Sequence, residues 1–284
     1  MKQQSESWDV IVESKSSLFE LNFKEVWKYK DLLWLLVRRD FISFYKQTVL
    51  GPFWFLIQPL FTVGIYIFIF SQIAGIPTDG IPQPLFYLTG IAAWTYFSDC
   101  VLKTSNVFRD NAHIFGKVYF PRLIMPLSIS VSNLVKFSIQ LLLIFIMITY
   151  YKLSGITLSL SPYLLFLPCF VVLMGLFGLG IGLIISSITI KYRDFSLLIS
   201  FAITLLMYTC PVVYPLSSIS GLTKQLVLLN PMTTIIEWFR FFLTGNNSNL
   251  TLFMSLYALG AVFFTFILGV IIFNKAQKNF IDTI

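Results

Sequence analysis

Charged residues are scarce in this chain, and so are the residues that build metal and disulfide sites. Asp, Glu, Lys and Arg make up only 12% of the 284 residues, whereas hydrophobic residues make up 57%. Soluble domains carry about a quarter of charged residues, so this composition excludes an ordinary soluble domain and indicates an integral membrane protein. The three cysteines are widely spaced and the single histidine has no Cys or carboxylate cluster beside it, which argues against a disulfide framework and a metal site.

Motifs for catalysis are also missing. No Gly-rich run ends in Gly-Lys-Ser/Thr, so the chain has no P-loop with which to hydrolyse ATP itself. No Asp-x-Asp pair and no Ser, His and Asp set suggests group transfer or hydrolysis. We therefore expect a protein that is not an enzyme and has no cofactor or metal of its own. The net charge of +7 is better explained by basic residues at the cytoplasmic membrane face than by nucleic acid.

Six apolar segments follow one another after residue 50 and set the expected fold class. They lie at about 52–74, 84–101, 123–150, 163–188, 195–214 and 252–273. Most of them reach the ~20 residues that a helix needs to cross the hydrocarbon core of a bilayer. We therefore expect an all-α integral membrane protein with six transmembrane helices, which form one membrane domain over residues 47–284.

Residues 23–46, just before the first span, have the pattern of an amphipathic helix that lies in the membrane surface. The segment contains no Pro or Gly, and at about 100° per residue its Trp and Phe residues fall opposite an arc of mostly basic residues. The candidate contacts to lipid head groups are Lys24, Trp27, Lys28, Trp34, Arg38, Arg39 and Lys46. Residues 1–22 are polar and lack the layout of a signal peptide, so they are expected to form a cytosolic N-terminal arm.

The distribution of Lys and Arg predicts the orientation in the membrane. With six spans and a cytoplasmic N-terminus, sixteen of the 20 Lys and Arg residues fall on the cytoplasmic side. Because positive residues accumulate in short cytoplasmic loops, both termini are expected to be cytoplasmic. The segment 211–240 then lies at the outer side.

The stretch 191–240 is a candidate transport pathway. A charged elbow, KYRD, precedes the fifth apolar segment, which closes on the sequence CPVVYP. The interrupted segment that follows suggests backbone dipping back into the bilayer, which is tolerated only where protein buries it or where it lines a cavity. Glu237 and Arg240, spaced i, i+3, form either a partly solvated surface pair or a polar element at a pore exit.

Few polar groups are expected inside the spans. Lys136 stands alone in the third span, and Asp99 lies near the inner end of the second, where an interfacial or helix-pairing role is favoured. A proton- or sodium-coupled carrier usually needs buried carboxylates or broken helices near the midplane, so one edge aspartate is weak support for it. Gly175, Gly178 and Gly182 lie near one helix face, which indicates close packing either within the chain or between subunits.

Several short motifs, in a fixed order along nearly the whole chain after residue 20, give a resemblance to a known family. They are LGPFWFLIQPL at Leu50–Leu60, IFGKVYFPRLIMPLS at Ile114–Ser128, KYRDFS at Lys191–Ser196 with CPVVYP at Cys210–Pro215, LNPMTTIIEWFR at Leu229–Arg240 and FIDTI at Phe280–Ile284. Each motif is weak alone. Together they make the chain resemble the membrane permease subunits of bacterial ABC exporters for polysaccharides, the group that handles O-antigens, capsules and teichoic acids.

This resemblance implies a homodimer of six-span permeases in the bacterial inner membrane, working with two copies of a separate ATPase subunit that binds ATP and Mg. It also implies a short coupling helix at about 111–119, which docks on the ATPase, and small gate helices at about 217–244, before the last span. The expected substrate is a lipid-linked polysaccharide, with undecaprenyl-linked O-antigen as the leading candidate. No nucleic acid is expected as a partner.

Two sets of residues are expected to carry these roles. The set expected to couple to the ATPase is Arg109, Asp110, Asn111, His113, Lys117, Arg122, Lys191, Arg193 and Asp194. The set expected at the exit gate is Pro211, Tyr214, Pro215, Asn230, Pro231, Glu237 and Arg240.

Other functions remain as alternatives. An ABC permease that exports a small amphiphile or drug shares the six-span plan and is the main alternative. A membrane glycosyltransferase or polymerase is disfavoured by the missing carboxylate pairs and metal motif. A secondary carrier is disfavoured by the lack of intramembrane carboxylates.

Overall fold

The computed structural model describes residues 23–46, 48–115, 120–156, 158, 161–192, 194–246 and 250–280. This part of the chain is helical and contains no strand, which confirms the expected all-α fold class. The helices are α1 (Phe23–Lys28), α2 (Lys30–Tyr45), α3 (Trp54–Tyr66), α4 (Gln83–Ser105), α5 (Val107–Asp110), α6 (Ala112–Phe115), α7 (Ile124–Leu153), α8 (Leu167–Thr189), α9 (Phe195–Met207), α10 (Gly221–Leu228), α11 (Pro231–Thr244) and α12 (Leu252–Phe280). Short 3-10 or π-helical stretches are η1 (Gly51–Phe53), η2 (Ile67–Ile73), η3 (Pro162–Phe166) and η4 (Leu216–Ser218).

Most of the predicted spans are present, with slightly different ends. The stretches long and apolar enough to cross a membrane are Gly51–Ile73, Gln83–Ser105, Ile124–Leu153, Pro162–Thr189 and Leu252–Gln277. A sixth candidate exists if α10 and α11, which are bent by 91° at a short break, count as one span. The described residues therefore hold five or six candidate spans, as expected of an integral membrane protein.

The fifth apolar segment forms a shorter helix than the sequence suggests. α9 has 13 residues and ends at Met207, which at 1.5 Å per residue is about 20 Å, less than the ~30 Å of a bilayer core. Residues 208–215 continue without α-helix. Pro211 explains this end, because proline lacks an amide hydrogen and disfavours helical conformation in the residue before it. The expected span over 195–214 is thus corrected to a short helix followed by turns.

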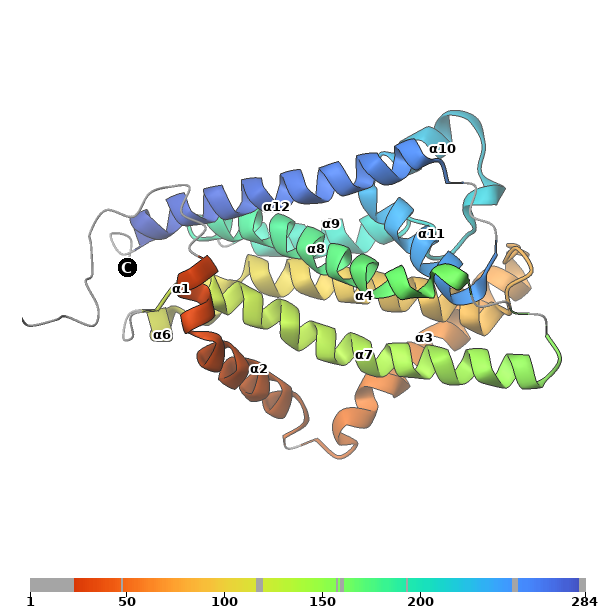
Figure 1. Ribbon diagram of the computed structural model, residues 1–284, viewed down its shortest axis with the longest axis horizontal. Helices are drawn as coiled ribbons and strands as arrows, with labels where there is room; N and C mark the ends of the chain where they lie inside the picture. The colour runs from red at the N-terminus through yellow and green to blue at the C-terminus, as the bar shows by residue number, and fades with distance from the viewer. Residues whose placement is uncertain are drawn as a thin grey trace, which may run out of the picture.

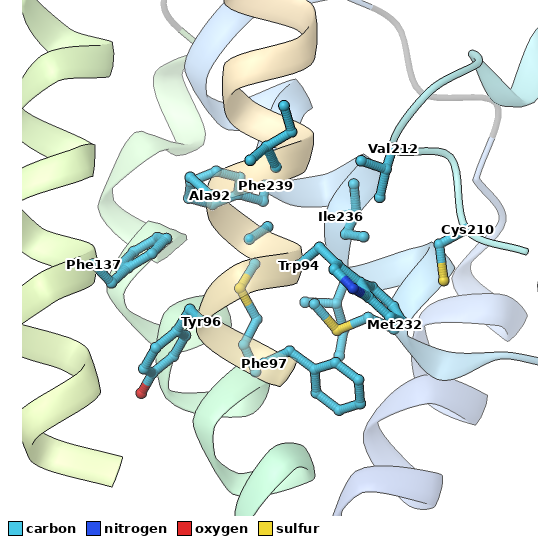
Figure 2. Close-up of a cluster of buried hydrophobic side chains, with 14 of the residues drawn as sticks. Ala92, Trp94, Tyr96, Phe97, Phe137, Cys210, Val212, Met232, Ile236 and Phe239 are labelled. Carbon is cyan, nitrogen blue, oxygen red and sulfur yellow. The ribbon is translucent and has the colours of Figure 1, made fainter. Parts of the chain in front are cut away.

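α4 forms the centre of the bundle (Figure 1). In its most apolar window 78% of the residues are buried, against 17% in Gly51–Ile73. α7 and α8 pack along α4, and α3 and α11 also contact it. In Figure 2, Tyr96 of α4 points toward Phe137 of α7, and Trp94 points toward Met232 of α11 on the other side. The most buried helix thus connects the long helices to the α11 region.

Glycines in α8 allow it to approach α4 closely. A Cβ added at Gly178 would lie 2.7 Å from the Cβ of Cys100, and one added at Gly182 would lie 2.6 Å from the Cβ of Thr104. Both distances are too short for a real side chain. The glycine face predicted from the sequence therefore serves packing within the chain, because its small residues are covered by α4.

The two ends of the bundle carry different elements (Figure 1). One end holds α1, α6 and the C-terminal end of α12. Toward the other end lie α10 and the C-terminal end of α11. At the first end Phe108 stacks on Phe273 of α12, with ring centroids 4.8 Å apart. The loop after α4 and the last helix are therefore packed together, and we call this the α6 end.

Candidate functional site

A buried ion pair connects α11 to the turn that follows α9. Arg240 is 4% exposed, and its guanidinium donates to the Glu237 carboxylate at 2.8 Å and to the carbonyl oxygen of Pro211 at 2.8 Å. It also lies 3.9 Å from the centroid of the Phe86 ring in α4. The Arg240 side chain is 5% exposed and the Glu237 side chain 13%, so the pair lies mostly inside the protein.

Asn230 holds the start of α11 against the same turn. Its side-chain oxygen accepts from the backbone N–H of Met232 at 3.0 Å, which caps the helix. Its side-chain amide donates to the sulfur of Cys210 at 3.1 Å. Pro231 occupies the first helical position, where its missing amide hydrogen costs nothing. The sharp bend between α10 and α11 is thus fixed to residues 210–211.

The structure brings four of the predicted exit-gate residues together and places the rest nearby. Pro211, Asn230, Glu237 and Arg240 are joined by the contacts above, and Pro231 begins α11. Tyr214 lies in the turn region, where its hydroxyl donates to the carbonyl of Tyr208 at 3.3 Å. Pro215 precedes η4. Whether this assembly gates a pore stays a prediction.

A second polar group lies between α4 and α7. The Lys103 ammonium donates to the Asn133 side-chain oxygen at 2.7 Å and lies 3.4 Å from the Asp99 carboxylate. Lys136, three residues after Asn133 on α7, lies 3.8 Å from the same carboxylate. The sequence suggested that Lys136 stands alone, and the structure shows that it does not. Asp99 connects α4 to α7. We call Asp99, Lys103, Asn133 and Lys136 the lysine cluster.

Two cavities meet at the lysine cluster. One, of ≈ 310 Å³, lies between α3, α4 and α7 and has aromatic and amide walls. The other, of ≈ 270 Å³, lies between α2 and α7 and is lined by Asp40, Phe41 and Ser43 of α2. Lys103, Asn133 and Lys136 line both. The cluster is thus reachable from the chamber beside α2 and from the chamber among the spans.

The predicted coupling helix at about 111–119 is only partly described, and α6 is the helical turn seen within it. α5 and α6 have four residues each, and the predicted helix at about 111–119 is seen only to Phe115, because residues 116–119, with Lys117, lie outside the described residues. His113 is exposed. Asn111 is 8% exposed and donates to the carbonyl of Val107 at 3.0 Å, so it stabilises this turn.

Other residues of the coupling set connect this loop to α9 and α12. Arg109 pairs with its neighbour Asp110 at 3.1 Å and donates to the hydroxyl of Ser196, in the first turn of α9, at 3.4 Å. Arg122 donates to the carbonyl of Gln277 in α12 at 2.8 Å. Burial lowers the pKa of Arg122 from its ordinary value. The loop therefore contacts two helices that lead away from the α6 end.

The elbow before α9 is only partly described. Lys191 is exposed, and its ammonium lies 5.3 Å from the centroid of the Tyr192 ring. Asp194 is exposed and directly precedes α9. Arg193 lies outside the described residues. Both described charges are accessible at the end of the bundle where α9 begins.

The N-terminal amphipathic segment consists of two helices instead of one. α1 and α2 are separated at Tyr29, whose ψ of 22° departs from helical geometry. Trp27 is 73% exposed and Trp34 is 64% exposed, whereas Leu36 and Val37 are buried. Lys28, Arg38, Arg39 and Lys46 are exposed, and the side chain of Lys24 lies outside the described residues. Exposed Trp and basic side chains on one helix pair suit a membrane surface. Residues 1–22, the predicted arm, lie outside the described residues.

Metal ligands do not cluster in the part of the chain that the structure describes. No group of three or more His, Cys, Asp or Glu side chains is close enough to hold an ion there. The lysine cluster is the functional candidate that sequence reasoning missed. The sequence did contain a signal for it. A charged residue inside a span is energetically costly, so each such residue is a candidate for function.

Known proteins resemble this chain over most of its length. The family model described as ABC-2 type transporter matches residues 31–244. An O-antigen export system permease protein RfbA from Klebsiella pneumoniae is 30% identical over 254 residues, which cover 89% of this chain and 94% of that relative. The protein of the same name from Myxococcus xanthus is 28% identical over 218 residues, 75% of this chain and 80% of that relative. Because the family model matches most of the chain, the protein belongs to the ABC-2 type transporter family.

Proposed function

We propose that this chain is the membrane permease subunit of an ATP-driven exporter for lipid-linked polysaccharide of the O-antigen kind. The observation that carries the proposal is the similarity to O-antigen export permeases, which extends over 89% of this chain and 94% of the Klebsiella relative. The family places the chain in a membrane as a multi-pass transport subunit with an ATP-binding partner.

The finer assignments are part of the same proposal. Two copies of the permease form a channel in the bacterial inner membrane, with both termini cytoplasmic, and two copies of a separate ATPase bind ATP and Mg. The α6 end then faces the cytoplasm, since it carries α1, α6 and the end of α12 (Figure 1). The excess of Lys and Arg in the connections at this end supports that orientation.

α9 is the proposed mechanical link between the ATPase and the outer gate. Its first turn accepts a hydrogen bond from Arg109, four residues before the exposed His113 in the sequence. Its last turn leads within four residues to Pro211, whose carbonyl holds Arg240. A shift of the coupling loop, driven by ATP, therefore displaces α9 and with it the turn on which α11 rests. Such coupling needs an element with two arrangements, and the turn at 208–215 is the proposed one.

The lipid-facing helices α1 and α2 have a proposed role at the entrance. Their exposed Trp residues anchor in the interfacial region, and their basic residues raise the local concentration of anionic lipid carriers. Both effects precede transport and are independent of ATP.

Reconstitution tests this proposal. The permease and its ATPase are placed in proteoliposomes with lipid-linked polysaccharide on the outer leaflet, where the ATPase faces out. ATP-dependent entry of polymer into the lumen is expected, and a matched preparation with the ATP-hydrolysing residue of the ATPase replaced should show none. Transport of a small amphiphile without transport of polymer would instead favour a drug-type exporter.

A further inference from the structure

The lysine cluster and its two cavities are not part of the gate or the coupling loop. Charged side chains inside a span are costly and face protein or a polar cavity when they occur. Here two lysines and one aspartate from α4 and α7 meet at 3.4 and 3.8 Å. The Asn133 side chain satisfies Lys103 further, at 2.7 Å. The larger cavity beside them holds ≈ 310 Å³, at the lower end of the range for small-ligand sites.

The charge of the cluster favours an anion. Two ammonium groups share the single Asp99 carboxylate, which leaves one positive charge in the larger cavity. Asp40 lines the smaller cavity, but its carboxylate is bound by Arg39 at 2.8 Å. A phosphate oxygen between the lysines would take the place of water beside the two ammonium groups and accept charge-assisted hydrogen bonds from them.

The remaining walls of the larger cavity have the chemistry of a sugar site. Phe55, Tyr66 and Phe137 present aromatic side chains, on which the apolar faces of a sugar ring pack. Gln58 and Gln140 offer side-chain amides that both donate and accept. Asp99 lies at the border between these walls and the lysines, where it can accept from a sugar hydroxyl. An anion-binding group thus adjoins a carbohydrate-binding group within one cavity.

The position of the cluster agrees with entry from the α6 end. Lys103 lies two residues before Ser105, where α4 ends and α5 begins. The smaller cavity extends from the cluster to α2, whose exposed Arg38 and Arg39 lie at the surface. A ligand whose anionic group travels along α2 therefore reaches the lysines before it reaches the outer side.

We infer that the lysine cluster binds the junction between the glycan and its lipid carrier: a sugar joined to phosphate or pyrophosphate, with the phosphate at Lys103 and Lys136 and the first sugar against Gln140 and Phe137. This inference rests on the proposed function, because it names the part of the lipid-linked polysaccharide that the permease recognises. It makes recognition depend on the glycosyl phosphate rather than on the polymer's later sugars.

Binding to the permease–ATPase complex in nanodiscs of phosphatidylcholine tests the inference. The probes are a short-chain prenyl pyrophosphoryl-N-acetylglucosamine and the same prenyl pyrophosphate without sugar. Lys136→Met should weaken both probes about tenfold or more, the effect of one charge-assisted hydrogen bond. Asp99 keeps Lys103 as its partner in this variant, so the fold is retained. Lys152→Met is the matched control, since it removes an exposed lysine at the far end of the same helix and should change neither affinity.

A second variant separates the sugar contact from the phosphate contact. Gln140→Leu should weaken the glycosylated probe and leave the sugar-free probe unchanged, because Gln140 is buried in the cavity wall one turn beyond Lys136. Equal weakening of both probes would contradict a sugar contact at this residue. Displacement of the probe by equimolar phosphatidylglycerol would also overturn the inference, since it would make the cluster a general phospholipid head-group site.

The outcome is distinct from a failure of the proposed function. If Lys136→Met binds both probes as tightly as the wild type while the wild-type complex exports polymer, the inference falls and the proposed function stands. If the wild-type complex neither binds the glycosylated probe nor exports polymer, both fall.

Discussion

The guanidinium of Arg240 donates a hydrogen bond to the carbonyl oxygen of Pro211 at 2.8 Å, across 29 residues of sequence. The same group pairs with Glu237 and lies over the ring of Phe86. Three elements, α4, α11 and the turn after α9, are therefore connected through one buried side chain. The proposed gate depends on this connection.

Replacing Arg240 should destabilise the permease strongly. Arg240→Met leaves the Glu237 carboxylate buried without a counter-charge, which typically costs about 3–5 kcal/mol. The measurement is thermal unfolding of the purified protein in detergent. Glu237→Gln/Arg240→Met is the control: it removes both charges and should recover much of the loss. A single variant as stable as the wild type would show that the pair does not hold α11 in place.

The close approach of α8 to α4 predicts a large effect of one methyl group. Gly178→Ala would place its Cβ 2.7 Å from the Cβ of Cys100 and 2.8 Å from the carbonyl oxygen of Phe97, a backbone atom that cannot move away cheaply. The melting temperature should fall, because overpacking of this kind costs roughly 1–3 kcal/mol.

Gly260→Ala is the matched control for this position. Gly260 is in α12 and has no neighbouring atom within 4 Å of an added Cβ. Since alanine favours helix over glycine by up to about 1 kcal/mol, this variant should be neutral or slightly more stable. A similar loss of stability in both variants would mean that close α4–α8 packing is not the cause.

The coupling loop predicts different results for two neighbouring residues. His113→Glu changes an exposed side chain in α6 and should weaken association with the ATPase while leaving thermal stability unchanged. Asn111→Ala removes a buried side chain that bonds to Val107, and should lower stability by about 1 kcal/mol. Co-purification of the ATPase and thermal unfolding distinguish them. Full ATPase binding by His113→Glu would remove His113 from the docking surface.

The amphipathic segment predicts where Trp34 lies in a bilayer. A variant that keeps only Trp34 should have its fluorescence quenched by lipids brominated near the head group, because this side chain is 64% exposed and tryptophan favours the interfacial region of a bilayer. A variant that keeps only Trp94, which is 5% exposed in the core, should be quenched little. Equal quenching of the two would contradict the interfacial position of α2.

The sequence predicts five of the six expected spans and the pairing of Glu237 with Arg240, because each depends on a local pattern. The i, i+3 spacing identifies Glu237 with Arg240, and Pro211 marks the end of α9 approximately. The partners of Arg240 in α4 and in the turn follow only from tertiary packing, so no local pattern indicates them.

The lysine cluster illustrates the same limit. Asp99 and Lys136 are 37 positions apart, and their contact arises from the way α4 packs on α7. In the sequence each is a single charge in an apolar run. The helix break at Tyr29 could not be predicted from the sequence either. The segment contains neither Pro nor Gly, and its helical periodicity continues across the break.

The central claim, that the protein exports a lipid-linked polysaccharide, is tested most directly by deleting its gene in the native host and locating the surface glycan by fractionation. The account predicts lipid-linked polymer accumulating on the cytoplasmic side, with none at the cell surface, and restoration by the wild-type gene. Normal surface glycan in the deletion strain would contradict it.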